Sequence, residues 1–201
     1  MTEMAPISVN TAISGNRPGT VGKPMPETFV EIVDLDGGHR VLPTGEAGEI
    51  RIKGPHMMRG YCNNESETAL VLRDGWVYTG DIGVLDEDGF LTITDRKKDM
   101  ILVSGFNVYP NEVEDVVAAH PDVLEAAAVG VADENAGEAI KLFVVSKNSQ
   151  LDAETLRAWC KKELTAYKVP KYIEFRDELP KTNVGKVLRR QLRDQETTHA
   201  P

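Results

Sequence analysis

In the stretch DRKKDMILVSGFNVYPNEVE, residues 95–114, the sequence changes from a pattern of strands alone to a mixture of strands and helices. It joins the basic cluster Arg96–Lys98 to the apolar run Met100–Val103, a glycine at position 105 and a proline at position 110. A short apolar run before a glycine is typical of a buried strand and a tight turn. Proline in a first helical turn, followed by a stripe of valines, predicts a helix that Pro121 stops.

Before this stretch the sequence is predominantly β. Short segments rich in strand-forming residues are bounded by glycine or aspartate, and they occupy residues 28–38, 48–54, 75–81 and 89–95. In GEIRIKG, Ile50 and Ile52 share one face, and Glu49, Arg51 and Lys53 share the other, which predicts a half-buried strand. The DEDG sequence at 86–89 lacks a full calcium-loop pattern and predicts a solvated hairpin turn. Residues 28–94 therefore predict a small all-β unit.

After Asp95 strands and helices mix. Strands are expected over 99–105, 124–133, 138–147 and 171–180, and helices over 110–121, 152–164 and 186–196. Asp152 is the expected cap of the second helix. We predict an α+β fold with domains at 1–95 and 96–201. The opening residues 1–26 contain no long periodic element, so we expect them to be disordered or to be part of something larger.

Composition excludes several classes of protein. The formal net charge of −9 argues against broad nucleic-acid binding, so an anion site must be a local basic patch. No apolar run approaches the roughly 20 residues that a membrane-spanning helix needs. The polar, Gly- and Pro-dotted opening does not have the pattern of a signal peptide. Two distant cysteines predict free thiols in a reducing compartment, and we expect a cytoplasmic protein.

Three short motifs carry groups that could perform chemistry. The loop LPKTNVGKVLRR places Lys186 beside Thr, Asn and Gly, which suits a mobile lysine that enters a site, although a solvated loop has the same composition. Asp81 ends VYTGD, where a carboxylate at a strand end could accept the hydroxyls of a ribose; a plain turn is the alternative. Thr2 and Glu3 offer a hydroxyl and a carboxylate suited to phosphate and Mg²⁺.

The order of five motifs resembles that of the adenylate-forming superfamily, which includes acyl-CoA synthetases and peptide-synthetase adenylation domains. The motifs are MTEMAP, GEIRIKG, DGWVYTGDIG, DRKKDMILVSGFNVYPNEVE and LPKTNVGK. Residues 74–100 are similar to the signature of fatty acyl-CoA synthetases, and residues 167–194 to bacterial long-chain fatty acid–CoA ligases. The resemblance implies a distorted, β-barrel-like end of a large adenylation domain, followed by a compact α+β lid domain.

The resemblance also implies a role for individual residues. Asp81 would hold the ribose hydroxyls of AMP, and Arg96 would assist at the ribose and phosphate. Thr2 would contact the α-phosphate, and Glu3 would be a ligand of Mg²⁺. Lys186 would bridge the substrate carboxylate and the nucleotide while the adenylate forms.

Two further positions are implied to serve domain movement and thioester formation. Asp95 would be the hinge about which the small domain swings after the first step. Gly105 would line the tunnel for the pantetheine arm of coenzyme A, because a side chain there would block it. The implied substrates and cofactors are a fatty acid, ATP (leaving as AMP), Mg²⁺ and coenzyme A.

Relatives of this kind carry a large N-terminal region with a phosphate loop and most of the acid tunnel. We therefore expect a C-terminal fragment that is inactive without this missing part. Alternatives are a ligase for a medium-chain, aromatic or carrier-linked acid, and a non-catalytic module that binds coenzyme A or adenylate. The resemblance leaves open a homodimer and peripheral association with the inner face of the membrane.

Overall fold

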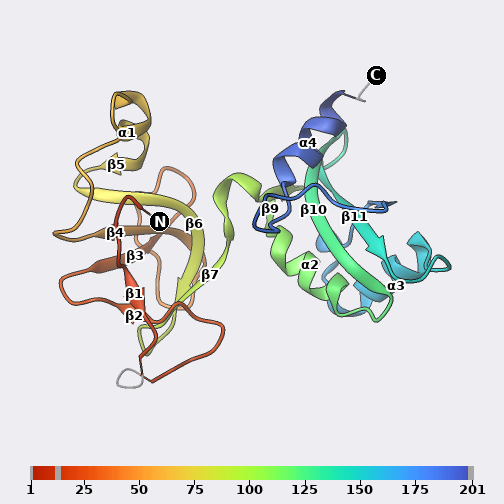
Figure 1. The fold of residues 1–201 in the computed structure, drawn as a ribbon, viewed down its shortest axis with the longest axis horizontal. Coiled ribbons are helices and arrows are strands. Elements are labelled where there is room, and N and C mark those ends of the chain that lie inside the picture. Colours follow the sequence, from red (N-terminus) through yellow and green to blue (C-terminus); the bar gives the residue numbers. More distant parts are fainter. Residues whose placement is uncertain (1, 12–14, 199–201) are drawn as a thin grey trace. The chain divides into compact units, whose positions relative to one another are not determined.

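The computed structural model describes residues 2–11 and 15–198, and the chain divides into two compact units, Met1–Lys98 and Asp99–Pro201 (Figure 1). The mixed α+β class is confirmed, with one sheet in each unit and a third, two-stranded pairing near the start. The domain boundary predicted between Asp95 and Arg96 lies just before the structural division and stays a prediction.

The first unit is built on an antiparallel sheet that curls into a half-barrel (Figure 1). Its strands run in the order β3-β4-β6-β5, and β7 also pairs with β6. They are β3 (Phe29–Val33), β4 (Gly48–Lys53), β5 (Leu72–Arg73), β6 (Trp76–Leu85) and β7 (Leu91–Arg96). A helix that the sequence reading missed, α1 (Glu65–Val71), begins where the side chain of Asn64 accepts a hydrogen bond from the amide of Glu67 at 3.2 Å.

The opening segment packs against this sheet. β1 (Ser8–Val9) pairs with β2 (Lys23–Pro24), and Met4 forms a bridge with Met57. Met4 is fully buried in a core cluster with Ile32, Ile50, Ile52, Val77 and Leu91. Residues 1 and 12–14 lie outside the described residues, but the segment around Met4 is an ordered part of the core, and the expectation of disorder is wrong there.

Two expectations about the β strands need correction. Strand β6 does not end at Asp81 but continues to Leu85. Glu49 does not face solvent with the other charges of β4, because it is only 4% exposed. The predicted hairpin turn after β6 is confirmed: one carboxylate oxygen of Asp86 accepts the amides of Asp88 and Phe90 at 3.0 and 2.8 Å.

The second unit contains a five-stranded sheet in the order β10-β11-β8-β9, with β12 added in parallel to β11. A single 3₁₀ turn, η1 (Lys97–Asp99), leads into it, and a second, η2 (Ala166–Lys168), follows α3. The strands are β8 (Ile101–Val103), β9 (Phe106–Val108), β10 (Val123–Asp133), β11 (Gly137–Ser146) and β12 (Tyr172–Phe175). The helices are α2 (Pro110–Ala118), α3 (Ala153–Glu163) and α4 (Arg189–Thr198).

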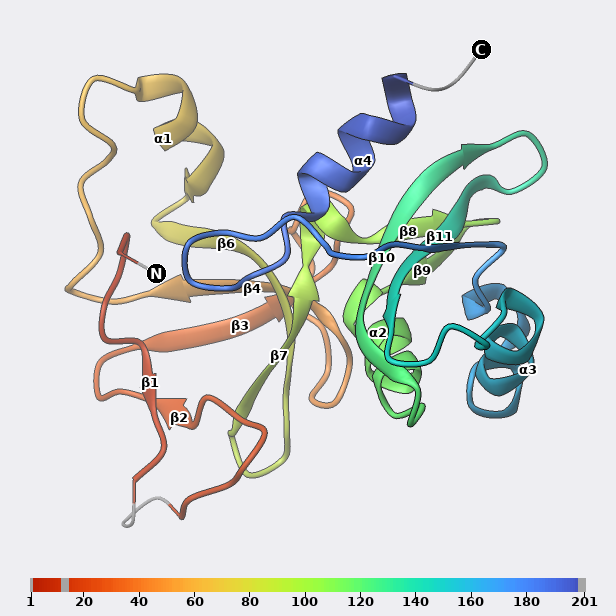
Figure 2. The ribbon, with the colours of Figure 1, turned by 45° about the vertical axis from the view of Figure 1, so that its right-hand side comes forward.

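Helices cover both faces of this sheet, and Figure 2 shows them around the long β10–β11 hairpin. Ile140, Leu142 and Val144 share a cluster with residues of α2 and α3. Phe143 and Val145, which alternate with them, pack with Leu192 of α4. Two covered faces explain why β11 reads as a nearly continuous apolar run rather than a clean alternation.

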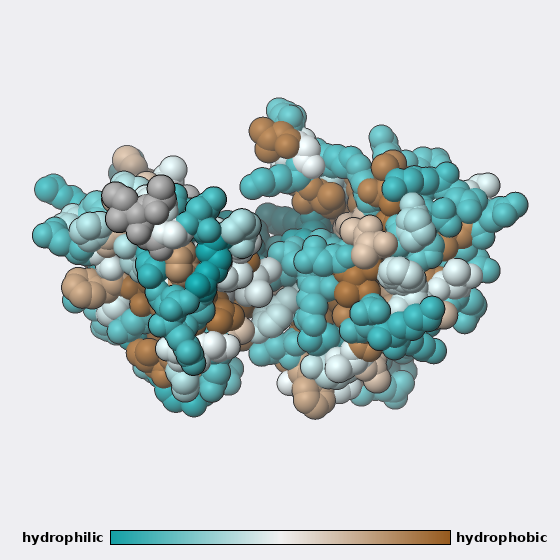
Figure 3. Space-filling model, turned by 90° about the horizontal axis from the view of Figure 1, so that it is seen from below, coloured by the Kyte–Doolittle hydropathy of each residue, from teal (hydrophilic) through white to brown (hydrophobic). Residues whose placement is uncertain are grey.

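Two predicted helix starts are confirmed, whereas the helix predicted from Lys186 begins at Arg189. Pro110 stands in the first turn of α2, and the carboxylate of Asp152 accepts the amide of Thr155 at 2.7 Å at the start of α3. Among the described residues, no helix has both the length and the apolar character needed to cross a membrane. Hydrophilic residues cover most of the face that Figure 3 displays, and the hydrophobic patches on it are small and separate.

Candidate functional site

A pocket of about 360 Å³ opens on the first unit. It is lined by Thr2, Glu3, Tyr61, Val71, Tyr78, Thr79, Asp81 and Arg96. Four of these residues, Thr2, Glu3, Asp81 and Arg96, are the nucleotide- and metal-site candidates from the sequence. The fold therefore brings together residues from position 2 to position 96 of the chain.

Burial of Met4 positions Glu3 at the pocket. The amide of Met58 donates to the carbonyl of Glu3 at 2.8 Å, which fixes the backbone beside the buried methionine. The hydroxyl of Tyr61 donates to the Glu3 carboxylate at 2.7 Å. This hydrogen bond lowers the pKa of Glu3, because it stabilises the ionised form, and it raises the pKa of Tyr61. Glu3 thus faces the pocket as a carboxylate anion.

A β-bulge positions Asp81. Tyr78 pairs with Arg51 and Ile82 pairs with Glu49, so Thr79, Gly80 and Asp81 together stand opposite the single residue Ile50. Gly80 has φ of 68°, a left-handed conformation that glycine adopts without steric cost. The Thr79 hydroxyl donates to the carbonyl of Ile50 at 2.9 Å and accepts the amide of Asp81 at 3.0 Å. Bulges re-aim side chains in this way near functional sites.

Asp81 and Arg96 face each other across β6 and β7, with Arg96 Nε 2.9 Å from Asp81 Oδ1. The Asp81 side chain is 19% exposed and the Arg96 side chain 59%, so the carboxylate is the more desolvated partner. Burial raises the pKa of Asp81, and Arg96 only partly opposes this shift. Ionised Asp81 therefore lowers the stability of the fold. Carboxylates with such perturbed pKa values are often found at binding sites.

The raised pKa predicts an unusual response to the Asp81→Asn substitution. A carboxyl group whose pKa is higher in the folded state stabilises the fold below its unfolded pKa, and this stability is lost as pH rises through the folded value. Asp81→Asn is therefore expected to raise the melting temperature of the 201-residue chain at neutral pH, with a gain that shrinks towards acid pH. Thermal unfolding over a pH series measures this difference.

Asp88 provides the matched control for Asp81. Its exposed carboxylate accepts a hydrogen bond from Arg17, which lowers the pKa of Asp88. Stability from a lowered pKa is present above the unfolded value and is lost as pH falls. Asp88→Asn should therefore lower the melting temperature at neutral pH, with a loss that shrinks towards acid. A destabilised Asp81→Asn variant at neutral pH would contradict the assignment of Asp81 as a desolvated group.

The residues of the pocket suit a metal that is shared with a ligand. Among residues 2–11 and 15–198, no group of three or more His, Cys, Asp or Glu side chains could enclose a metal ion. Mg²⁺ is commonly held by one or two carboxylates together with substrate phosphates. The ionised Glu3 fits such a partial site, and a cage made by protein alone does not.

The second unit holds Gly105 at the turn between β8 and β9. Ser104 and Gly105 have φ of 51° and 84°, so both central residues of this two-residue hairpin are left-handed, as a type I′ turn requires. A Cβ added at Gly105 would meet no atom within 4 Å. The turn geometry is a sufficient reason for glycine here, whereas the role at a pantetheine tunnel stays a prediction.

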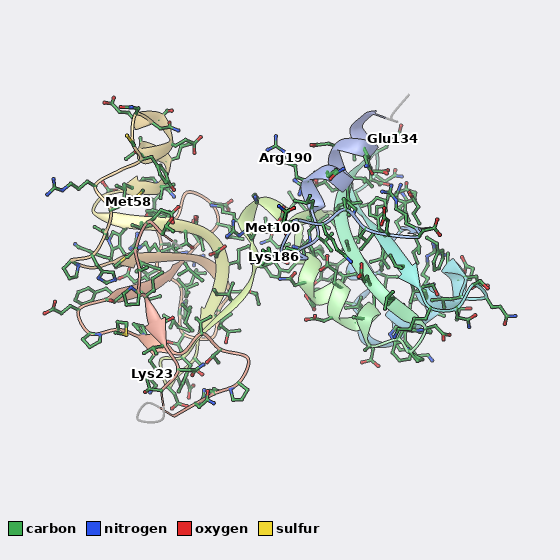
Figure 4. The ribbon with its side chains drawn as sticks, in the orientation of Figure 1. Lys23, Met58, Met100, Glu134, Lys186 and Arg190 are labelled. Atoms are coloured by element: carbon green, nitrogen blue, oxygen red, sulfur yellow. The ribbon has the colours of Figure 1, made fainter. Side chains whose placement is uncertain are left out.

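Lys186 lies on the loop that leads into α4, where Figure 4 labels it together with Arg190. The loop is closed by backbone bonds from Thr182 to the Lys186 carbonyl at 2.8 Å and from Leu188 to the Pro180 carbonyl at 2.8 Å. Lys186 is exposed, and its side chain has no ion pair within the described part of the chain. Lys181 on the same loop differs, because its ammonium pairs with Glu125 at 2.5 Å.

Asp95, the predicted hinge, lies inside β7 and is 2% exposed. One of its carboxylate oxygens accepts the amide of Arg96 at 2.7 Å, which helps to orient the start of the basic cluster. Its role as a hinge stays a prediction. Among the pocket residues that the sequence reading missed, Tyr61 carries no local signal, since its partner Glu3 is 58 positions away.

Two family models match the sequence. Residues 1–62 match the model described as AMP-binding enzyme, and residues 112–186 match the AMP-binding enzyme C-terminal domain. The chain therefore contains segments of both domains that these models describe. Its two family segments fall on either side of the structural division, with Glu3 in the first and Lys186 at the end of the second.

The curated relatives that the chain matches include long-chain-fatty-acid–CoA ligases. The sequence is 55% identical to the enzyme of Escherichia coli O6:H1 over 97% of the chain and 35% of that ligase. It is 48% identical to the ligase of Bacillus subtilis over 98% of the chain and 35% of the relative. The chain thus spans about a third of the length of the curated relatives that it matches and corresponds to their C-terminal part.

Solved structures agree with this assignment. ATP-bound MatB from Rhodopseudomonas palustris has a TM-score of 0.90 and 35% identity, over 97% of this chain and 39% of that protein. The o-succinylbenzoate CoA synthetase of Bacillus subtilis has a TM-score of 0.78 in its complex with the acyl-adenylate intermediate and of 0.77 in its complex with AMP. It is 38% identical over 87% of this chain and 35% of that protein.

Proposed function

We propose that the chain supplies the C-terminal share of an AMP-forming long-chain fatty acid–CoA ligase. The observation that carries the proposal is the meeting of Thr2, Glu3, Asp81 and Arg96 in one pocket. High identity to fatty acid ligases supports the acid class, and the ATP-bound and adenylate-bound neighbours support the nucleotide. In this proposal the overall reaction converts ATP, a fatty acid and coenzyme A into acyl-CoA, AMP and pyrophosphate.

The pocket on the first unit would take the nucleotide. The Asp81 carboxylate would accept hydrogen bonds from the ribose hydroxyls, and the exposed Arg96 would reach the ribose and phosphate. The Thr2 hydroxyl would contact the α-phosphate. Glu3 would contribute one oxygen to Mg²⁺, which would neutralise phosphate charge as the reaction proceeds.

In the first step, an oxygen of the fatty carboxylate attacks the α-phosphorus, and pyrophosphate leaves with the bonding electrons. Lys186 would stabilise the negative charge that develops between the carboxylate and the nucleotide. In the second step, the thiol of coenzyme A loses its proton and its sulfur attacks the acyl carbon, and AMP leaves. We propose that Gly105 lines the approach of the pantetheine arm, and that a pivot near Asp95 allows the second unit to serve both steps.

The second candidate is a ligase for a different acid. It is favoured by the structural neighbours, since one is described as a synthetase for o-succinylbenzoate and another as an amide bond synthetase from Marinactinospora thermotolerans. The pocket residues of this chain contact the nucleotide in our proposal and do not distinguish between acids. Acid selectivity must therefore be measured in a protein that also contains an acid tunnel.

The test uses a fusion in which the part of the Escherichia coli ligase that precedes the matched region is joined to residues 1–201. We expect this fusion to form acyl-CoA from a long-chain acid, ATP and coenzyme A, with Mg²⁺ required. A ladder of short, medium, long and aromatic acids tests the long-chain assignment. A folded fusion that fails with every acid, beside an active parent ligase, would overturn the proposal.

A further inference from the structure

Glu49 is a buried charged residue with two partners in the first unit. Its side chain is 5% exposed, and its Oε2 accepts a hydrogen bond from the ammonium of Lys97 at 2.9 Å. Its Oε1 accepts the amide of Gly80 at 3.3 Å. Burying a carboxylate is costly unless it is paired and hydrogen-bonded, so both contacts are needed to keep this anion inside the sheet.

Each partner of Glu49 is the immediate neighbour of a pocket residue. Gly80 precedes Asp81 within the bulge of β6, and Lys97 follows Arg96 at the end of β7. Glu49 itself does not line the pocket. One buried side chain therefore connects the two strands whose side chains form the Asp81–Arg96 pair.

The bulge explains why such a connection is needed. Three residues of β6 stand opposite one residue of β4, so the amides in the bulge cannot all pair with strand carbonyls. The Thr79 hydroxyl accepts a hydrogen bond from the amide of Asp81, and the Glu49 carboxylate accepts one from the amide of Gly80. Without Glu49, the amide of Gly80 would lose its hydrogen-bond acceptor, and only the Thr79 hydroxyl would still fix the bulge. The side chain of Asp81 could then change its orientation.

We propose that Glu49 is a positioning residue of the nucleotide pocket: it ties the bulge at Gly80 to Lys97 and so sets the geometry between Asp81 and Arg96. The inference has two halves. The structural half, that Glu49 sets the geometry between Asp81 and Arg96, concerns this chain alone. The functional half, that this geometry affects the use of ATP, rests on the proposed function. It assigns a task to a glutamate whose position in an alternating strand indicates only a solvent-facing charge.

Two substitutions separate the contacts of Glu49. Glu49→Gln keeps an oxygen that can accept the Gly80 amide but removes the charge that pairs with Lys97. Glu49→Ala removes both contacts. Glu31→Gln is the matched control, because Glu31 pairs with Arg51 across β3 and β4 at 2.5 Å and has no contact with the bulge.

The structural half is tested by amide and carboxyl NMR of the isolated 201-residue chain. We expect Glu49→Ala to shift the amide signals of both Gly80 and Asp81 and to change the titration of the Asp81 carboxyl. Glu49→Gln should leave the Gly80 amide near its original position and shift Arg96 and Lys97. Lys97→Met, which leaves Gly80 in contact with Glu49, should resemble Glu49→Gln.

The result that would overturn the structural half is a folded Glu49→Ala chain whose Gly80 and Asp81 signals match those of the parent or move no more than in Glu31→Gln. If Glu49→Ala does not fold, Glu49→Gln and Lys97→Met decide the matter. Unchanged Arg96 signals and an unchanged Asp81 titration in both variants would contradict the proposal.

The functional half is tested in the fusion. Misplacement of a binding group by about 1 Å can cost about 100-fold in rate, so we expect Glu49→Gln to lower kcat/KM for ATP by about 10- to 100-fold. Most of this loss should fall on the KM for ATP, with the KM for the acid little changed and Glu31→Gln near the parent. NMR shifts without a kinetic effect would overturn only the functional half, and an inactive parent fusion would count against the proposed function instead.

Discussion

The Lys186→Ala substitution is expected to slow acyl-adenylate formation in the fusion by about 100- to 1,000-fold, the loss typical of removing one group that stabilises developing charge. Lys186 suits this task because it is exposed on a loop closed by backbone bonds and has no ion pair among the described residues. Acid-dependent exchange of pyrophosphate into ATP measures this step. Thioester formation from added acyl-adenylate and coenzyme A should change little.

Lys181→Ala is the matched control on the same loop. Its ammonium is already engaged by Glu125, so it cannot serve a ligand without breaking that pair. We expect exchange within a few-fold of the parent for Lys181→Ala. Equal losses for the two lysine variants, or a loss in the thioester step as large as that in exchange, would show that Lys186 does not have the role proposed here.

The second large effect concerns the stability of the second unit. Phe143→Ala is expected to lower its free energy of unfolding by about 3–5 kcal/mol, as is usual for truncating a buried aromatic residue. Phe143 is fully buried on the face of the sheet that α4 covers, in a cluster with Leu179 and Leu192. Its removal would leave a cavity between β11 and α4, and the loop that carries Lys186 leads directly into this helix.

Urea unfolding followed by the fluorescence of Trp159 measures this loss, in a Trp76→Phe background that leaves a single tryptophan in the second unit. Phe175→Ala is the control, since Phe175 lies on the neighbouring strand β12 and is 38% exposed. Its loss should stay within about 1 kcal/mol. Similar losses for the two phenylalanines would contradict the two-faced packing of this sheet.

The local features that the sequence predicted correctly depend on short-range rules. Pro110 at a helix start, Asp152 as a cap and the hairpin turn after β6 are decided by residues within a few positions of each other. The order of the motifs identified the pocket residues Thr2, Glu3, Asp81 and Arg96. No local rule connects these four residues, so their grouping came from the resemblance to a family, and their roles stay predictions.

The features that the sequence reading missed depend on pairing between distant segments. Glu49 reads as a solvent-facing charge in an alternating strand, and only the bulge of β6 and the approach of Lys97 bury it. Tyr61 lies in a loop and gains its role from a partner 58 positions away. For Gly105 a local signal was present: glycine is common at type I′ turns, and the hairpin explains this residue without a ligand.

The most direct test of the central claim is acid-dependent exchange of labelled pyrophosphate into ATP, compared between the fusion and the 201-residue chain alone. We expect exchange by the fusion that requires a long-chain acid and Mg²⁺, and none by the chain alone. Exchange by the chain alone would mean that these residues contain a complete phosphate site that the pocket around Asp81 does not explain. A folded fusion without exchange, beside an active parent ligase, would contradict the claim that this chain provides the C-terminal share of an adenylate-forming ligase.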